Sequence, residues 1–339
     1  MQLDQTRLNE LYRVGRHVEL AETGDSDLGP LQLLPGTWKN VTDDATNRDT
    51  DGRGWNMIAL PVRGEGRPGF RLLLNRYNEE LKFSLVDKAV PNRGVTPDAD
   101  GDVDQLLVTL DFEQMITQTD AADKPESGLA GGPNLAIHHE PGLFLFMTNF
   151  ADGDVDVARL STIPHGDSVL ALGTSDVIDE PTEADVAVPP VDGLPIGAGT
   201  DLETSRYLTP YREFRDNPFL GLFDPTRPPA RLQAPFPGTI TGVTRLSFDS
   251  TRPQGGIHNI PFVVREANAA ELKSIFWIVE TTDDQGRRRL FLQYLQTVLL
   301  DFFPRFDGMP GLIRWPHVSI NRMEKIDEPS YEKAQMPRA

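Results

Sequence analysis

Hydrophobic and polar residues alternate with a period of two along much of this chain, most clearly over residues 105–117. A period of two is typical of a β-strand with one face in a core and one face in solvent. The intervening residues include the charged Asp111 and Glu113. The predicted inner face carries Leu106, Val108, Leu110, Phe112, Gln114 and Ile116.

Similar stretches predict further strands, separated by turn-forming residues. The short gap after Tyr77 predicts a hairpin, and Pro141-Gly142 predicts a strand break. Evenly spaced strands with hardly any helix favour an antiparallel sandwich or barrel over a parallel α/β fold. The number of strands exceeds the roughly eight that a ligand-holding barrel needs, so we expect a cavity. Residues 31–38 lead into a first strand. The further predicted strands are 55–62, 70–77, 81–86, 105–117, 135–140, 143–149, 156–163, 168–173, 238–248, 257–265, 274–281, 289–303 and 312–323.

Three segments depart from the strand pattern. Residues 3–20, within a lead-in at 1–30, have the spacing of a short amphipathic helix that acts as a lid or an outer packing helix. Residues 175–235 are acidic and proline-rich, yet they contain aromatic residues that a disordered linker would not need. We therefore expect a partly ordered insertion within a single β-barrel domain at 31–325. The charged segment 326–339 is expected to be a loose tail.

Composition excludes several classes of partner and of chemistry. The formal net charge is −18, which repels phosphate backbones and anionic lipids, so we expect neither nucleic acid nor a membrane as a partner. The chain contains no cysteine, which excludes disulfides and a thiol nucleophile and leaves histidine, carboxylate or tyrosine for any metal chemistry. The first residues do not resemble a signal peptide, and no run of 18 apolar residues occurs. A cytoplasmic protein is the expectation.

Two of the six histidines are adjacent, in the sequence His138-His139-Glu140. On a strand, His138 and Glu140 share one face and His139 lies on the other, so only one of the two histidines can face a barrel interior. A carboxylate two residues away could orient the imidazole or a bound peroxide. The same pattern also fits a surface His–Glu pair at a strand end.

His317 lies in the last predicted strand, at the centre of residues 315–319 (WPHVS). It shares a face with Ser319 and Asn321, which suits a ligand that lines a cavity and equally suits an exposed polar strand face. Trp315 offers a flat apolar surface for a planar cofactor, although aromatic residues in strands are more often plain core.

One further histidine is a candidate because of its place in a turn. His165 lies in residues 163–167 (IPHGD), and turns at barrel mouths often carry function; the alternative is a turn residue without a role. Other site types are missing from the sequence. It contains no phosphate-binding loop, dinucleotide fingerprint or nucleophile elbow, and no histidines at zinc-binding spacing.

Nine motifs, in order along the chain, together carry a resemblance to a known family. They are LPGTW (34–38), GRGWNMIALP (52–61), VPNRG (90–94), FEQMI (112–116), IHHEPG (137–142), IPHGDSVLA (163–171), NIPF (259–262), QYLQ (293–296) and WPHVS (315–319). With these motifs the chain resembles the nitrobindin-like, fatty-acid-binding-protein-like haem proteins, and more closely the haem-binding peroxidase-like β-barrels. The resemblance runs from about residue 31 to 325; singly, only Gly-Thr-Trp and His-x-Glu-x-Gly are recognisable.

The resemblance implies a roughly ten-stranded antiparallel barrel of the lipocalin, FABP and nitrobindin type, with haem b at its mouth. It implies that His317 is the iron ligand and that His138 lies near the haem. Trp315, for its flat apolar surface, and His165, for its place in a turn, are our further candidates for cofactor contacts. Two features depart from the family. Nitrobindins are about half as long, so the acidic insertion either covers the open haem edge or forms an interface, for example in a homo-oligomer. The Gly-x-Gly that follows Gly-Thr-Trp in nitrobindins is replaced here by Lys39-Asn40-Val41.

The leading hypothesis is a haem b protein in which neutral His317 binds ferric iron and the other face meets a small oxidant such as peroxide, peroxynitrite or nitric oxide. This would make the protein a haem-dependent peroxidase or a peroxynitrite isomerase. His138 would act as acid and base, and Arg159 or Arg93 would stabilise charge on oxygen. The alternatives are a non-enzymatic carrier of an apolar small molecule and an assembly subunit that uses the acidic insertion.

Overall fold

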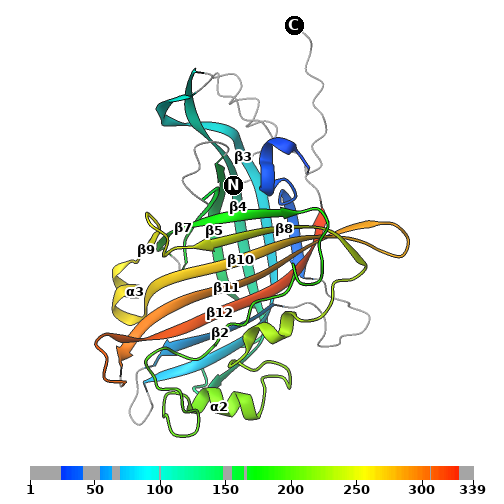
Figure 1. Ribbon diagram of the computed structural model, residues 1–339. Helices are drawn as coiled ribbons and strands as arrows, with labels where there is room; N and C mark the ends of the chain where they lie inside the picture. Colours follow the sequence, from blue (N-terminus) through cyan, green and yellow to red (C-terminus); the bar gives the residue numbers. More distant parts are fainter. Residues whose placement is uncertain are drawn as a thin grey trace.

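The computed structural model describes residues 24–40, 54–62, 69–98, 101–147, 155–163, 166–305 and 307–327. Within these residues twelve strands form one sheet (Figure 1). The strands are β1 (Gly36–Asn40), β2 (Gly54–Pro61), β3 (Phe70–Asp98), β4 (Gly101–Lys124), β5 (Leu135–Met147), β6 (Val157–Ser161), β7 (Ser168–Ile178), β8 (Thr239–Asp249), β9 (Gly256–His258), β10 (Asn268–Thr282), β11 (Arg288–Pro304) and β12 (Leu312–Asp327).

Ten of these strands close into an antiparallel ring. Their order is β12, β11, β10, β8, β7, β6, β5, β4, β3 and β2, and β2 pairs back with β12. β1 pairs with both β3 and β12, and β9 pairs with β7. The predicted all-β antiparallel class is therefore confirmed. Closure gives both edge strands of the sheet a partner.

The alternation predicted for residues 105–117 is observed in β4. From Phe112 to Gln118, every second residue is buried on one face of the strand, and the residues between them are less buried or exposed. Gln114 and Ile116 on this face line a cavity inside the ring. The period of two thus assigned the inner face correctly.

Two predicted breaks are wrong. Residues 70–77 and 81–86 belong to one strand, β3, because the polar residues between them continue the pairing with β4 and Glu79 turns inward to buried partners. Pro141-Gly142 also lies within a continuous strand, β5. A Cβ on Gly142 would lie 2.4 Å from the ring of Phe112, so this glycine allows close packing and does not mark a turn.

The predicted strand at 257–265 is also wrong beyond its first residues. After β9 the chain forms helix α3 (Pro261–Glu266), which begins with proline in its first turn, where the missing N–H costs nothing. Phe262 and Val264 are 62% and 56% exposed, so their apolar character does not reflect burial. The other helical elements are η1 (Ser26–Leu31), α2 (Thr209–Asp216) and η2 (Pro228–Leu232).

The helix expected at 3–20 and the tail beyond Asp327 lie outside the described residues. In the described ranges, no helix is both long and apolar enough to span a membrane.

Residues 179–238, between β7 and β8, pack against the outer face of the ring. Phe223 stacks on Trp55 of β2 at 5.5 Å between ring centroids, and Tyr207 stacks on Phe70 of β3 at 5.7 Å. Helix α2 from this segment lies beside the β2 end of the molecule (Figure 1). This segment buries the outer face of β2 and β12, which explains why Val318 and Ile320 of β12 are buried although they point away from the cavity.

The interior of the ring has an aromatic part and a hollow part. In the aromatic part the rings meet mainly edge to face, with 5.2 Å between Phe112 and Phe144 and 5.0 Å between Phe144 and Phe248. The hollow part is a cavity of about 370 Å³. The aromatic cluster consists of Phe83, Phe112, Phe144, Phe248 and Phe276.

Candidate functional site

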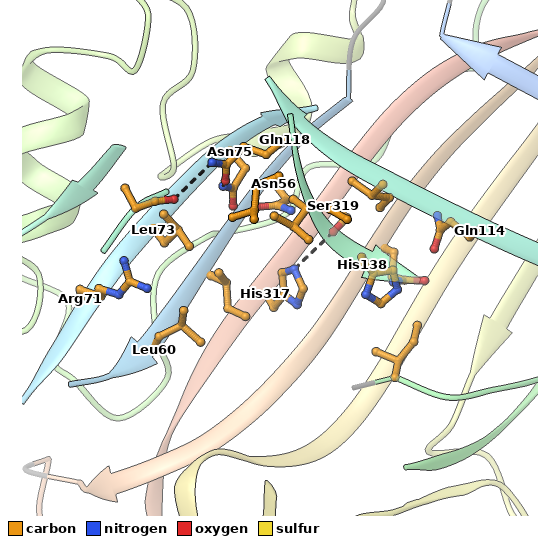
Figure 2. A pocket seen from close by; sticks show the side chains of 18 of the residues that line it. Asn56, Leu60, Arg71, Leu73, Asn75, Gln114, Gln118, His138, His317 and Ser319 are labelled. Carbon is orange, nitrogen blue, oxygen red and sulfur yellow. Dashed lines mark hydrogen bonds between the residues drawn. The ribbon is translucent and has the colours of Figure 1, made fainter. Parts of the chain in front are cut away.

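The cavity is formed by strands from both ends of the sequence together with the loop between β4 and β5 (Figure 2). Its volume lies within the range of roughly 300–1,000 Å³ that small-molecule sites occupy. Polar and apolar side chains both reach it. The lining residues are Asn56, Ile58, Leu60, Arg71, Leu73, Asn75, Gln114, Ile116, Gln118, Leu129, Ala130, Leu135, Ala136, Ile137, His138, Ile163, Tyr294, Gln296, His317 and Ser319.

Strand register sets one wall of this cavity. Gln296 of β11 pairs with Ser319 of β12, Ser319 pairs with Asn56 of β2, and Asn56 pairs with Asn75 of β3. Directly paired residues share a face, so four polar side chains form a continuous row across four strands, here called the polar row. Figure 2 shows its members Asn56, Asn75 and Ser319 beside one another.

The polar row contains one buried polar atom without a partner. Asn56 is 8% exposed, and its Oδ1 has no hydrogen-bond partner among the described residues. Asn75, in contrast, donates to Gln118, whose Nε2 donates to the Gly132 carbonyl at 2.9 Å. A buried acceptor left unsatisfied costs free energy, so the Asn56 oxygen is available to a ligand that donates a hydrogen bond.

His317 projects into the cavity from β12, two residues before Ser319. Its Nε2 lies 3.4 Å from the Ser319 hydroxyl, a weak contact. Burial, with a smaller contribution from the charge of His138, lowers the pKa of His317 to about 4. The ring is therefore neutral at physiological pH, and one of its nitrogens carries a lone pair that can bind a metal or accept a proton.

His138 enters the same cavity from β5. It pairs with Ile116, and Glu140 pairs with Gln114, so both lie on the inner face, as the alternation predicts. His138 is 21% exposed and its Nε2 lies 3.2 Å from Glu140 Oε2. His139 points the other way, with 57% of its side chain exposed. Because Glu140 is fully buried, His138 and Glu140 do not form a surface pair.

Arg159 of β6 lies behind Glu140 and does not line the cavity. Its Nη2 donates to Glu140 Oε1 at 2.7 Å, and its Nη1 donates to Gln296 Oε1 at 2.6 Å. The guanidinium also faces Phe112 and Phe276, each with its ring centroid 5.5 Å away. Arg159 thus connects the aromatic cluster to two residues of the cavity side, Glu140 and Gln296.

The charge of Glu140 follows from these neighbours. Burial alone would raise the pKa of this carboxyl, but the charge of Arg159 and the hydrogen bond from His138 outweigh that effect and hold the pKa below its usual value. Glu140 is therefore ionised at neutral pH and can orient the imidazole of His138.

The other predicted site residues have different positions. Trp315 is fully buried, stacks on Phe302 at 4.9 Å and donates its Nε1–H to the Phe302 carbonyl; it does not line the cavity. His165 and the side chain of Arg93 lie outside the described residues. Of the predicted site residues, the structure brings His138 and His317 to the cavity and places Arg159 behind it.

Sequence reasoning missed Glu79, a carboxylate next to the cavity wall. Glu79 is 3% exposed and accepts hydrogen bonds from Gln114 and Tyr294, which both line the cavity. It lies in a stretch interpreted as a turn. The signal that could have found it is the alternation from Tyr77 to Leu85, in which Tyr77, Leu81, Phe83 and Leu85 are buried and Glu79 falls on the same face.

No family model matches this chain, and no curated protein matches it. The resemblance to nitrobindin-like haem proteins therefore stays a prediction. Within the described part of the chain, no group of three or more His, Asp or Glu side chains could hold a metal ion.

We expect Arg159→Met to destabilise the protein by about 3–5 kcal/mol, because it leaves a buried carboxylate without its cation. The measurement is the free energy of unfolding in urea at pH 7. The control is Arg245→Met, which breaks an exposed pair with Asp176 at 2.6 Å and should cost less than about 1 kcal/mol. Equal losses in both variants would contradict the importance of the Glu140–Arg159 pair.

We expect the folded protein to lose stability as the pH falls from 6.5 to about 4, in part through His317. The unfolded chain protonates this imidazole near pH 6.5, whereas the folded state does so only near pH 4; the proton therefore favours the unfolded state in this window, by up to about 3 kcal/mol. Urea unfolding of His317→Gln between pH 4.5 and 7 should show a shallower slope. The exposed His258→Gln should keep the native slope, and an unchanged slope in His317→Gln would refute the assignment.

Proposed function

We propose that the cavity binds haem b, with His317 as the protein ligand of the iron, and that the protein acts on peroxide. The observation that carries this proposal is the meeting of two histidines from β5 and β12 in one cavity, with His317 held neutral by its surroundings. The finer likeness to a nitrobindin-type barrel belongs to the same proposal.

The residues of the cavity fit haem in three respects. Iron binds the neutral imidazole, and the 3.4 Å contact with Ser319 leaves little hydrogen bonding for the metal to displace. A porphyrin supplies four nitrogen ligands of its own, so a single protein ligand suffices. Aliphatic side chains provide an apolar surface for the macrocycle: Ile58, Leu60, Leu73, Ile116, Leu135, Ile137 and Ile163.

Bound haem would supply the electrons that reduce the peroxide bond. The protein would supply proton transfer through His138. In the tautomer whose Nε2–H donates to Glu140 Oε2, the lone pair is on Nδ1, which can take a proton from one peroxide oxygen and return it to the other. The ionised Glu140 fixes this tautomer and the orientation of the ring.

Arg159 has a positioning role in this scheme. Its hydrogen bonds hold Glu140 behind His138 and fix the Gln296 amide by its oxygen. The amide nitrogen of Gln296 is then the end that can donate to an oxygen atom in the cavity, and Asn56 Oδ1 can accept from a hydroxyl. A hydroperoxide both donates and accepts, so it can hydrogen-bond with either group.

Haemin titration of the purified protein tests haem binding. We expect a Soret band that saturates at one equivalent in the wild type and is shifted or lost in His317→Ala, because the iron loses its ligand. His258→Ala, which removes an exposed histidine of β9, is the control. A colourless wild-type protein that binds fatty acids and ignores haemin would overturn the proposal in favour of the apolar carrier.

Stopped-flow reaction with hydrogen peroxide tests His138. We expect His138→Ala to retain the Soret band and to react about 10²–10⁴-fold more slowly, because the proton transfer is lost. The adjacent His139→Ala is a matched control, since its ring lies on the opposite face and pairs with Glu113. Equal rates for His138→Ala and the wild type would remove His138 from the mechanism.

A further inference from the structure

Two tyrosines and a carboxylate form a buried hydrogen-bonded chain that begins at the cavity wall. Tyr294 lines the cavity, and its hydroxyl donates to Glu79 Oε2 at 2.7 Å. The hydroxyl of Tyr77 lies 2.9 Å from that of Tyr294 and 3.3 Å from the Ile320 carbonyl. Tyr77 and Tyr294 are 0% and 2% exposed. The mechanism proposed above does not use any of these three side chains.

Three neutral hydrogen-bond donors surround the buried carboxyl group of Glu79. Gln114 Nε2 donates to Oε1 at 2.6 Å, and Asn321 Nδ2 and the Tyr294 hydroxyl each donate to Oε2 at 2.7 Å. Three donors suit a carboxylate, which only accepts. Burial raises the pKa of Glu79 above its usual value despite these bonds, so this carboxylate is a stronger base than one in water.

The phenols of Tyr77 and Tyr294 are protonated. Burial, followed by the negative charge of Glu79, raises the pKa of both Tyr77 and Tyr294 well above that of free tyrosine. Each therefore keeps its proton at neutral pH. A neutral phenol that loses an electron becomes a strong acid, so its oxidation is far easier when a base stands at hydrogen-bond distance. Glu79 occupies that position for Tyr294.

We propose that Tyr294 is a redox-active tyrosine that gives one electron to an oxidised cofactor bound in the cavity and its phenolic proton to Glu79. This inference rests on the proposed function, because the oxidant is haem from which peroxide has withdrawn electrons. The O–H bond of Tyr294 breaks, one electron passes to the oxidised haem, and the proton moves to Glu79 Oε2. The products are a neutral tyrosyl radical and a carboxyl group.

Four other buried aromatic donors in the described part of the chain, Tyr211, Trp277, Trp38 and Trp315, do not donate to a carboxylate. The hydroxyl of Tyr211 and the Nε1 of Trp277 are buried and have no hydrogen-bond partner in the described ranges. Trp38 and Trp315 donate to the carbonyls of Leu34 and Phe302, and a carbonyl is too weak a base to take the proton. Among these five side chains, Tyr294 is the one whose proton has a carboxylate acceptor at hydrogen-bond distance.

The position of Tyr294 also favours a long-lived radical. Its near-complete burial keeps reductants in solvent away from the phenoxyl oxygen. The hydroxyl of Tyr77 can donate to that oxygen and stabilise it. The radical would store one oxidising equivalent next to the cavity, where a second substrate molecule could reduce it.

The test is electron paramagnetic resonance of haem-loaded protein frozen shortly after addition of hydrogen peroxide. We expect a tyrosyl signal in the wild type and its loss in Tyr294→Phe. Glu79→Gln should also lose most of the signal, because the phenol remains but its base is gone. Tyr77→Phe, which keeps the Tyr294–Glu79 pair, should retain the signal with an altered g-anisotropy. Tyr211→Phe is the matched buried control and should match the wild type.

A second measurement separates this inference from the haem proposal. Ultraviolet photolysis of the frozen apoprotein ionises tyrosine without haem, and we expect a persistent signal that depends on Tyr294 and Glu79 and not on Tyr211. Lack of a Soret band together with this signal would refute haem binding and support the Tyr294–Glu79 pair. A signal that survives in Tyr294→Phe, or no tyrosyl signal in either experiment, would overturn the assignment to Tyr294.

Discussion

The ion pair between Arg159 and Glu140 is the interaction on which the two parts of the interior depend. The guanidinium lies among the rings of the aromatic cluster and donates to Glu140 and Gln296, which belong to the cavity side. A buried charge is tolerated only when it is paired and hydrogen-bonded. The pair therefore lies at the boundary between the aromatic cluster and the cavity. It also holds Glu140 in the position from which it orients His138.

Strand register explains why the cavity has this lining. In a closed antiparallel ring every second residue faces inward, and directly paired residues share a face. The pairing of β11, β12, β2 and β3 places amide and hydroxyl side chains in one row, with the apolar Ile58 and Leu73 paired two residues further along β2 and β3. The boundary between polar and apolar lining is a direct consequence of this register.

The sequence predicted the strand content, the inner face of β4, and the faces of His138, His139 and Glu140, since each depends only on a local period of two. It also predicted that His317 shares a face with Ser319 and Asn321, but it left open whether that face was inside or exposed. The choice depends on ring closure between β12 and β2, a contact between residues far apart in sequence. Glu79 was missed because a run of polar residues normally indicates a turn, and only its partners from β4, β11 and β12 make its burial tolerable.

Glu79 and Glu140 are two buried carboxyls beside one cavity, and their surroundings move their pKa values in opposite directions. The charge of Arg159 outweighs the effect of burial on Glu140 and lowers its pKa. At Glu79 the donors among the described residues are neutral, and burial raises the pKa. A carboxylate bound to a guanidinium resists protonation, so it can orient a neighbouring side chain through a stable hydrogen bond. A carboxylate held by amides and a phenol can take up a proton at a smaller cost. This contrast supports orientation by Glu140 and proton uptake by Glu79, and two carboxyls whose surroundings move their pKa values apart are typical of sites that carry out acid–base chemistry.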